Sequence, residues 1–183
     1  RGVSHGPLRF LFTVGEEMGL EGAKVVDPVW LAGASYLLNT DGFHLGRAVV
    51  GSAGGRRECW TRALDTCPAR SGEAWQISIT GGTGGHSGDD IHLGRINPIQ
   101  VLAAYLKDQP ALAVAHFAGG SAFNAIPAGA EAVVVGQKPD LAGLKEALLP
   151  FRSTDPDLKL ELSPVDRPET VWTADFRRDV LDL

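Results

Sequence analysis

The sequence predicts a mixed fold, a short α/β segment over residues 1–55 followed by an antiparallel α+β domain over residues 56–183. Three observations support this prediction. Two apolar runs flank a short helix-like piece near the start of the chain. Alternating apolar and polar residues, typical of half-buried strands, occur only in the second part. Between the two parts, the stretch "GSAGGRR" combines glycine with charge, as domain boundaries often do.

The first part has the pattern strand, helix, strand. Residues 8–14, "LRFLFTV", form an apolar run that predicts a buried strand. A helix-like piece at 23–26 stops before Asp27-Pro28, because a residue that precedes proline disfavours helical backbone. Residues 35–41, "SYLLNTD", predict a second strand that ends at Asp41. Fully apolar strands need neighbours on both sides, so we expect partner strands outside this segment.

The second part predicts the order βαββαβ, followed by a last helix, which is the ferredoxin-like arrangement of an antiparallel sheet with helices on one face. Asn97-Pro98 has the composition of a helix start, a capping residue followed by proline at the first helical position. Trp172, Phe176 and Val180 recur every fourth residue and predict the closing helix. The remaining predicted strands and helices cover 74–80, 97–106, 111–117, 130–136, 140–149 and 157–163.

Composition argues against several classes of partner. The net charge is −5 and lysines and arginines are not clustered, which disfavours nucleic acid and anionic membranes. The chain has neither an apolar run long enough to span a membrane nor the pattern of a signal peptide, so a cytoplasmic location is expected. Cys59 and Cys67 lack the spacing of a zinc site and are interpreted as free thiols.

Two adjacent acidic residues follow the first apolar run. On extended backbone, Glu16 and Glu17 would point to opposite sides, so that one could hold a metal and the other could face a substrate. Asp41 ends the next predicted strand, and parallel strands gather functional groups at their carboxyl ends. This pattern suits a metallohydrolase. The alternative is that the glutamates are solvated loop charges and that Asp41 forms a turn before Gly42.

The segment "GGTGGHSGDD", residues 81–90, places His86 in a glycine-rich loop. A phosphate-binding loop is excluded because no Lys-Ser/Thr pair follows and because Asp89 and Asp90 would repel an anion. In such a loop a histidine ring can project away from the sheet and donate to an oxyanion or a carboxylate. The alternative is that the glycines serve a tight turn and that His86 is merely exposed.

Three stretches taken together resemble a known family. They are "HGPLRFLFTVGEEMGLEGAK", then "LLNTD" with "GSAGG" downstream, and "GGHSGDDIHLGRINP" followed by "FNAIP". In this order and at these intervals they resemble the aminoacyl-histidine dipeptidases, also called Xaa-His dipeptidase, peptidase D or cytosolic non-specific dipeptidase. These are zinc metallopeptidases with two co-catalytic metals. The resemblance covers nearly the whole chain.

The resemblance implies a role for five residues. Glu16 matches the general base that acts on the metal-bridging water, and Glu17 matches a ligand of one zinc. Asp41 matches a ligand of the other zinc. His86 matches the histidine that stabilises the tetrahedral oxyanion, and Asn124 matches an asparagine that contacts the carboxyl end of the substrate.

The resemblance also implies an architecture. Residues 1–55 correspond to part of an α/β zinc-exopeptidase catalytic domain, and residues 56–183 correspond to its ferredoxin-like lid and dimerisation domain. A dipeptide substrate and a homodimer formed through the lid are expected. Further metal ligands of the family, a His-x-Asp segment, a bridging aspartate and a last histidine, have no match here. We therefore expect an internal fragment that is inactive alone.

Some positions depart from the family pattern. Gly15 and Phe123 stand where polar residues are usual, which puts the contacts to the substrate in question. Two other functions stay open for this sequence. One is a related amidohydrolase, such as a tripeptidase or an acyl-amino-acid deacylase. The other is a non-catalytic module for dimerisation or ligand binding.

Overall fold

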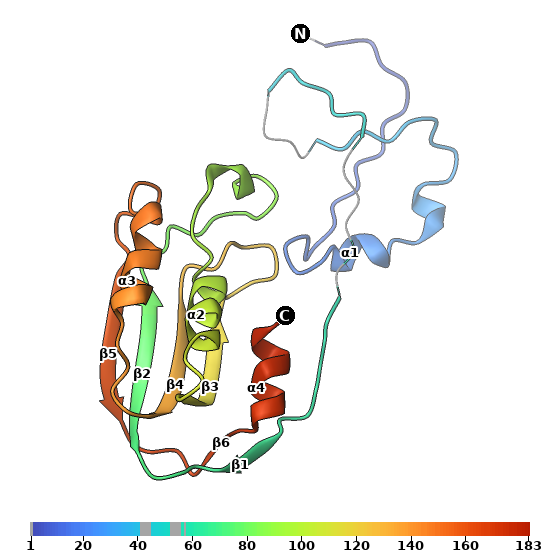
Figure 1. The fold of residues 1–183 in the computed structure, drawn as a ribbon. Helices are drawn as coiled ribbons and strands as arrows, with labels where there is room; N and C mark the ends of the chain where they lie inside the picture. Colours follow the sequence, from blue (N-terminus) through green and yellow to red (C-terminus); the bar gives the residue numbers. More distant parts are fainter. Residues whose placement is uncertain (1, 41–44, 52–55, 57) are drawn as a thin grey trace. The chain divides into compact units, whose positions relative to one another are not determined.

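The computed structural model describes residues 2–40, 45–51, 56 and 58–183. The chain divides into two compact units, unit 1 (Arg1–Arg57) and unit 2 (Glu58–Leu183), and each is described by itself. Figure 1 shows that unit 2 holds the strands and the longer helices. Both units together make a mixed α/β protein.

Unit 2 is built on a four-stranded antiparallel sheet with the order β3-β4-β2-β5. Ile77 at the centre of the sheet pairs with Ala132 on one side and with Leu162 on the other. The alternating residues predicted at 74–80 and 157–163 are therefore paired strands, with Ile77 and Ile79 fully buried. The four strands are β2 (Glu73–Thr80), β3 (Ala113–Gly119), β4 (Ala130–Gly136) and β5 (Lys159–Val165).

Helices α2 (Pro98–Lys107) and α3 (Ala142–Leu148) cover one face of this sheet (Figure 1). Helix α2 begins as predicted, since the Asn97 side chain accepts hydrogen bonds from the first turn at 3.1 and 3.4 Å. A short 3-10 turn, η3 (Leu149–Phe151), extends α3. The element order from β2 to β5 agrees with the predicted βαββαβ order.

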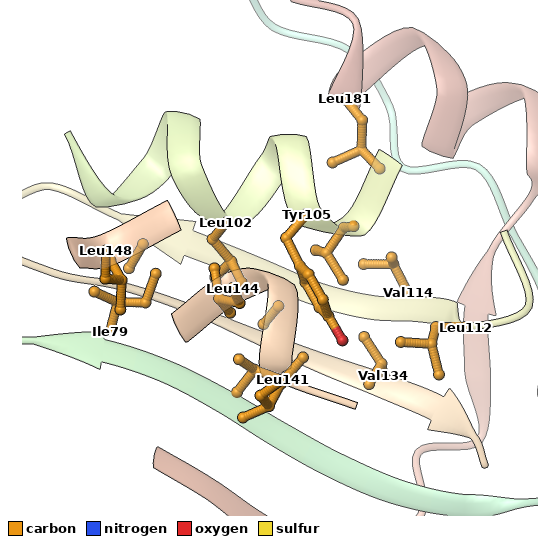
Figure 2. Close-up of a cluster of buried hydrophobic side chains, with 14 of the residues drawn as sticks. Ile79, Leu102, Tyr105, Leu112, Val114, Val134, Leu141, Leu144, Leu148 and Leu181 are labelled. Carbon is orange, nitrogen blue, oxygen red and sulfur yellow. The ribbon is translucent and has the colours of Figure 1, made fainter. Parts of the chain in front are cut away.

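The core of unit 2 lies between the helices and the sheet. Figure 2 shows Leu102 and Tyr105 of α2 beside Leu144 of α3, above Val134 of the sheet. Leu102, Leu144 and Val134 are completely buried. Burial of a leucine or valine side chain contributes about 1.5–3 kcal/mol, so this layer is the main source of stability in unit 2.

A second, two-stranded sheet was not predicted. It pairs β1 (Thr66–Pro68) with β6 (Thr170–Trp172) in antiparallel register. The closing helix α4 (Ala174–Leu181) begins after Thr173, whose hydroxyl caps Phe176 N–H at 3.3 Å. The prediction that Trp172 lies in this helix is wrong, because Trp172 pairs with Thr66 in the two-stranded ribbon formed by β1 and β6. Its ring still packs edge-to-face on Phe176 at 5.3 Å, which explains the helical spacing.

Unit 1 contains α1 (Glu21–Lys24) and the 3-10 turn η1 (Pro28–Trp30). The strands predicted at 8–14 and 35–41 are not formed over the described residues 8–14 and 35–40, and this prediction is wrong for them. No strand within the described part of unit 1 offers them a partner, so their side chains stay in water, with Phe12 90% and Leu38 85% exposed. Residues 41–44 lie outside the described residues.

Candidate functional site

Two loops of unit 2 meet at one end of its sheet. The histidine loop, residues 81–95, follows β2, and the asparagine loop, residues 120–128, joins β3 to β4. Their backbones are tied at three places: Gly82 N to Ala128 O at 2.9 Å, Ile126 N to Gly85 O at 2.8 Å and Ser87 N to Asn124 O at 2.8 Å. The last two of these hydrogen bonds make an isolated antiparallel bridge between His86 and Ala125. The structure therefore brings the two predicted residues His86 and Asn124 to one place.

The first glycine of the histidine loop is needed for a close approach. Gly81 has φ +76°, and a Cβ atom there would lie 2.1 Å from the carbonyl oxygen of Asp157. Any other residue would have to move the backbone, because real Cβ atoms do not come that close. The glycine content of this loop thus has a structural reason, in agreement with the alternative stated above for its glycines.

The ring of His86 is accessible and oriented. Its side chain is 55% exposed, and its Nδ1 atom accepts a hydrogen bond from Gly88 N at 3.2 Å. Because an accepting ring nitrogen carries no proton, the neutral ring carries its proton on Nε2. Asp89 also lies 3.7 Å from Nδ1, a contact that would pair with a protonated ring. The hydrogen bond from Gly88 N determines the orientation of the ring, since an exposed ion pair at 3.7 Å contributes little.

Asn124 lies at the start of the bridge between the loops and is half-buried. Its backbone carbonyl accepts the hydrogen bond from Ser87 N, the residue next to His86. The neighbouring residue, Phe123, is 60% exposed. Asn124 is thereby fixed relative to the histidine loop through the main chain.

Glu16 and Glu17 lie in unit 1, and both are exposed. The expectation that they continue a buried strand on extended backbone is wrong. The carbonyl of Glu16 instead accepts hydrogen bonds from Gly19 N at 3.0 Å and Leu20 N at 2.9 Å, which closes a turn that leads into α1. Asp41, the third acidic candidate, lies outside the described residues.

A buried carboxylate that the sequence analysis missed supports the histidine loop. Asp155 is completely buried and accepts hydrogen bonds from Thr83 N at 2.7 Å, Ile96 N at 3.0 Å and the Thr154 hydroxyl at 2.8 Å. Burial alone would raise the pKa of Asp155, but these hydrogen bonds favour the charged form and hold its pKa below the ordinary value. Asp155 thus pins the histidine loop to the segment before α2.

An ion pair closes the histidine loop on itself. Arg95, after the 3-10 turn η2 (Ile91–Leu93), donates from Nη1 to Asp90 Oδ2 at 3.0 Å and to Gly84 O at 2.5 Å, both of which precede this turn. The sequence offered a signal for this pair, because Asp90 and Arg95 flank the "IHLG" segment of the motif. Neither residue was predicted to have a role, because the "IHLG" segment contributed only to the family resemblance.

Among the described residues, no three His, Cys, Asp or Glu side chains are grouped so as to hold a metal ion. The described residues therefore do not make up a zinc site by themselves, since a zinc ion takes about three or four protein ligands. Within the same part of the chain, no helix is long and apolar enough to cross a membrane. Cys59 and Cys67 are free and exposed, as expected.

Comparison with solved structures identifies the class of protein that shares this fold. The chain matches part of the crystal structure of an aminoacylhistidine dipeptidase from Vibrio alginolyticus with a TM-score of 0.58. The match covers 65% of this chain and 27% of that chain at 24% sequence identity. At this identity the likeness shows only that this chain and part of that structure share a fold.

A curated relative is similar in sequence as well. It is the cytosol non-specific dipeptidase of Escherichia coli (strain K12), 37% identical over 136 residues, which are 72% of this chain. The resemblance to the aminoacyl-histidine dipeptidases is thereby confirmed. The matched region spans only 28% of the length of that relative. No protein-family profile matches the chain.

Proposed function

We propose that this chain is part of a zinc-dependent dipeptidase that hydrolyses the peptide bond of dipeptides. Support comes from the similarity to a curated dipeptidase over 136 residues. Residues 56–183, with their βαββαβ order, would be the ferredoxin-like lid and dimerisation domain. Residues 1–55 would be part of the catalytic domain. The relative's name, a cytosol dipeptidase, supports a cytoplasmic location, and a homodimer through the lid follows from the family resemblance.

The structural observation that supports a role in peptide-bond hydrolysis is the state of the His86 ring. Nδ1 is engaged by Gly88 N–H, and more than half of the side chain is exposed. This leaves the Nε2–H group of the neutral ring as the donor toward a ligand. During attack on a peptide bond the carbonyl oxygen gains negative charge, and a fixed donor of this kind stabilises it. His86 is proposed to be that donor.

The other proposed roles concern the carboxylates and Asn124. Glu16 would take the proton of the attacking water and return it to the leaving amine. Glu17 and Asp41 would be zinc ligands, and Asn124 would contact the carboxyl end of the dipeptide. The described residues do not complete a zinc site by themselves. Zinc would supply Lewis-acid chemistry when bound.

The proposal is tested on the product of the complete gene, with a panel of unblocked dipeptides, tripeptides and N-acyl amino acids. Dipeptide hydrolysis that is lost on chelation and restored by Zn²⁺ is expected. Preference for tripeptides or N-acyl amino acids would favour the related amidohydrolases instead. Absence of any hydrolysis would favour a non-catalytic module.

The role of His86 is tested with a matched pair of variants. His86→Ala is expected to lower kcat by about 10²–10³, the usual cost of removing one oxyanion donor. His92→Ala changes the other histidine of the same loop, which is exposed in η2, and is expected to retain activity. Equal activities of the two variants would contradict the assignment.

A further inference from the structure

Asp90 holds both backbone groups of His86, one through its carboxylate and the other through its own N–H. Asp90 Oδ2 accepts a hydrogen bond from His86 N at 3.1 Å, and Asp90 N donates to His86 O at 2.8 Å. The same Asp90 oxygen also accepts from Arg95 Nη1 at 3.0 Å, and Arg95 Nη1 reaches Gly84 O as well. Residues 84–86 are thus bound between an anion and a cation whose side chains are only 32% and 20% exposed.

Gly85 provides an independent observation that the Asp90–Arg95 pair lies in close contact with this backbone. Gly85 has φ +127°, which disfavours other residues. A Cβ atom there would lie 2.1 Å from Arg95 Nη1 and 2.3 Å from Asp90 Oδ2. The approach of the ion pair therefore depends on the absence of a side chain at 85.

The ring of His86 lacks comparable support. The contacts described for it are the hydrogen bond from Gly88 N and the 3.7 Å approach of Asp89. An exposed ring of this kind keeps its direction only if the backbone that carries it is fixed. Charge-assisted hydrogen bonds, such as those made by Asp90 and Arg95, are stronger than neutral ones.

We infer that Asp90 and Arg95 are positioning residues for His86, fixing residues 84–86 so that the ring projects from a constant point with its proton on Nε2. This inference rests on the proposed function for the role of that ring. It can be tested without it, because tautomer and amide exchange are properties of the chain itself.

The test uses nuclear magnetic resonance on the isotope-labelled 183-residue chain, at a pH where the ring is neutral. In the wild type, Nδ1 is expected to be unprotonated, Nε2 protonated, and the His86 amide slow to exchange. Arg95→Leu and Asp90→Asn are expected to speed that exchange by about 10- to 100-fold, the factor for a hydrogen bond to a charged group. The two ring tautomers should then average. Arg95→Lys, which keeps the cation, should restore part of the wild-type behaviour.

Asp175→Asn is the control, because it removes another Arg–Asp pair, the 2.9 Å contact with Arg178 on α4. Its His86 signals should stay unchanged. Slow exchange of the β2 and β4 amides shows that each variant is folded. If Arg95→Leu does not fold, Asp90→Asn, which keeps an acceptor oxygen, tests the inference in its place. Unchanged His86 exchange and tautomer in the folded variants would overturn the inference.

Kinetics of the complete gene product separate this inference from the proposed function. If both hold, Arg95→Leu lowers kcat more than it raises KM. If the variants alter the His86 signals but hydrolysis does not depend on His86, the proposed catalytic role of His86 is refuted and the positioning role stands. Hydrolysis that needs His86 but is unaffected by Arg95→Leu would refute the positioning role alone.

Discussion

Two equally apolar segments of this chain, strand β4 and residues 8–14, differ in structure, because the first is paired and buried and the second is unpaired and exposed. Strand β4 pairs with β2 on one side and with β3 on the other, and its residue Val134 is completely buried. Residues 8–14 form no ladder, and Phe12 is 90% exposed. Apolar composition stabilises a strand only where neighbouring strands satisfy the backbone and a second layer covers the side chains. In the described residues, unit 2 supplies both and unit 1 supplies neither.

Hydrogen exchange gives the most direct test of the difference between β4 and residues 8–14. Amides of residues 133–135 are expected to exchange at least about 10³-fold more slowly than those of residues 8–12, because exchange of β4 requires global opening. Mass spectrometry or nuclear magnetic resonance measures the difference. Firm protection at 8–12 would show that this segment is paired in solution.

Truncating one leucine in each unit gives the next largest effect. Leu144→Ala leaves a cavity under α3 and is expected to lower the free energy of unfolding by about 2–5 kcal/mol. Leu38→Ala removes a side chain that is 85% exposed and should change it by less than about 0.5 kcal/mol. Chemical denaturation measures both. Similar losses in the two variants would mean that Leu38 is packed.

The pH dependence of the free energy of unfolding tests what the buried carboxylate of Asp155 contributes to unit 2. The pKa of Asp155 is lower in the fold than its ordinary value of 3.8. The stabilisation that ionised Asp155 gives to the folded state is therefore complete above pH 3.8, and it is lost as the pH falls through the lower folded-state pKa. Asp155→Asn is expected to cost about 1–3 kcal/mol near neutral pH, and this difference should shrink below pH 3.8. A difference that is independent of pH would exclude the charge as its cause.

Substitution of the capping residue of one helix in each unit gives the smallest expected effect and a closely matched pair of variants. Asn97→Ala removes the cap of α2 and should cost about 1 kcal/mol of unfolding free energy. Asp27 caps η1 in the same way, accepting from Val29 N at 2.9 Å. Asp27→Ala is expected to leave the unfolding midpoint unchanged, since η1 has no buried residue to couple it to a core. A shift of the midpoint by Asp27→Ala would contradict this view of unit 1.

The sequence predicted those parts of the fold that depend on neighbouring residues. Alternation at 157–163 and the Asn97-Pro98 cap are local signals, and both led to the observed elements. The ribbon of β1 and β6 was missed because strands of three residues carry no periodicity. The strands predicted in unit 1 failed for the opposite reason, since their pattern is local but their formation needs partners.

The candidate site shows the same limit. His86 was recognisable because a histidine among glycines is unusual. Asp155 was not, because "STDPD" resembles an ordinary turn and its partner Thr83 lies 72 residues away. A buried carboxylate reveals itself only when distant loops are brought together, so residues that support a site are harder to find than those that face solvent.

The ribbon of β1 and β6 also bears on how such a protein can be assembled from modules. Because Cys67 and Val171 are paired, the polypeptide enters and leaves the four-stranded sheet at adjoining positions. A module with adjoining entry and exit can be grafted into a surface turn of a host protein, and the host needs little rearrangement to accept it. The segment between β1 and β6 therefore has the connectivity of an insert, so that a protein engineer can transfer this sheet and its two covering helices to another scaffold.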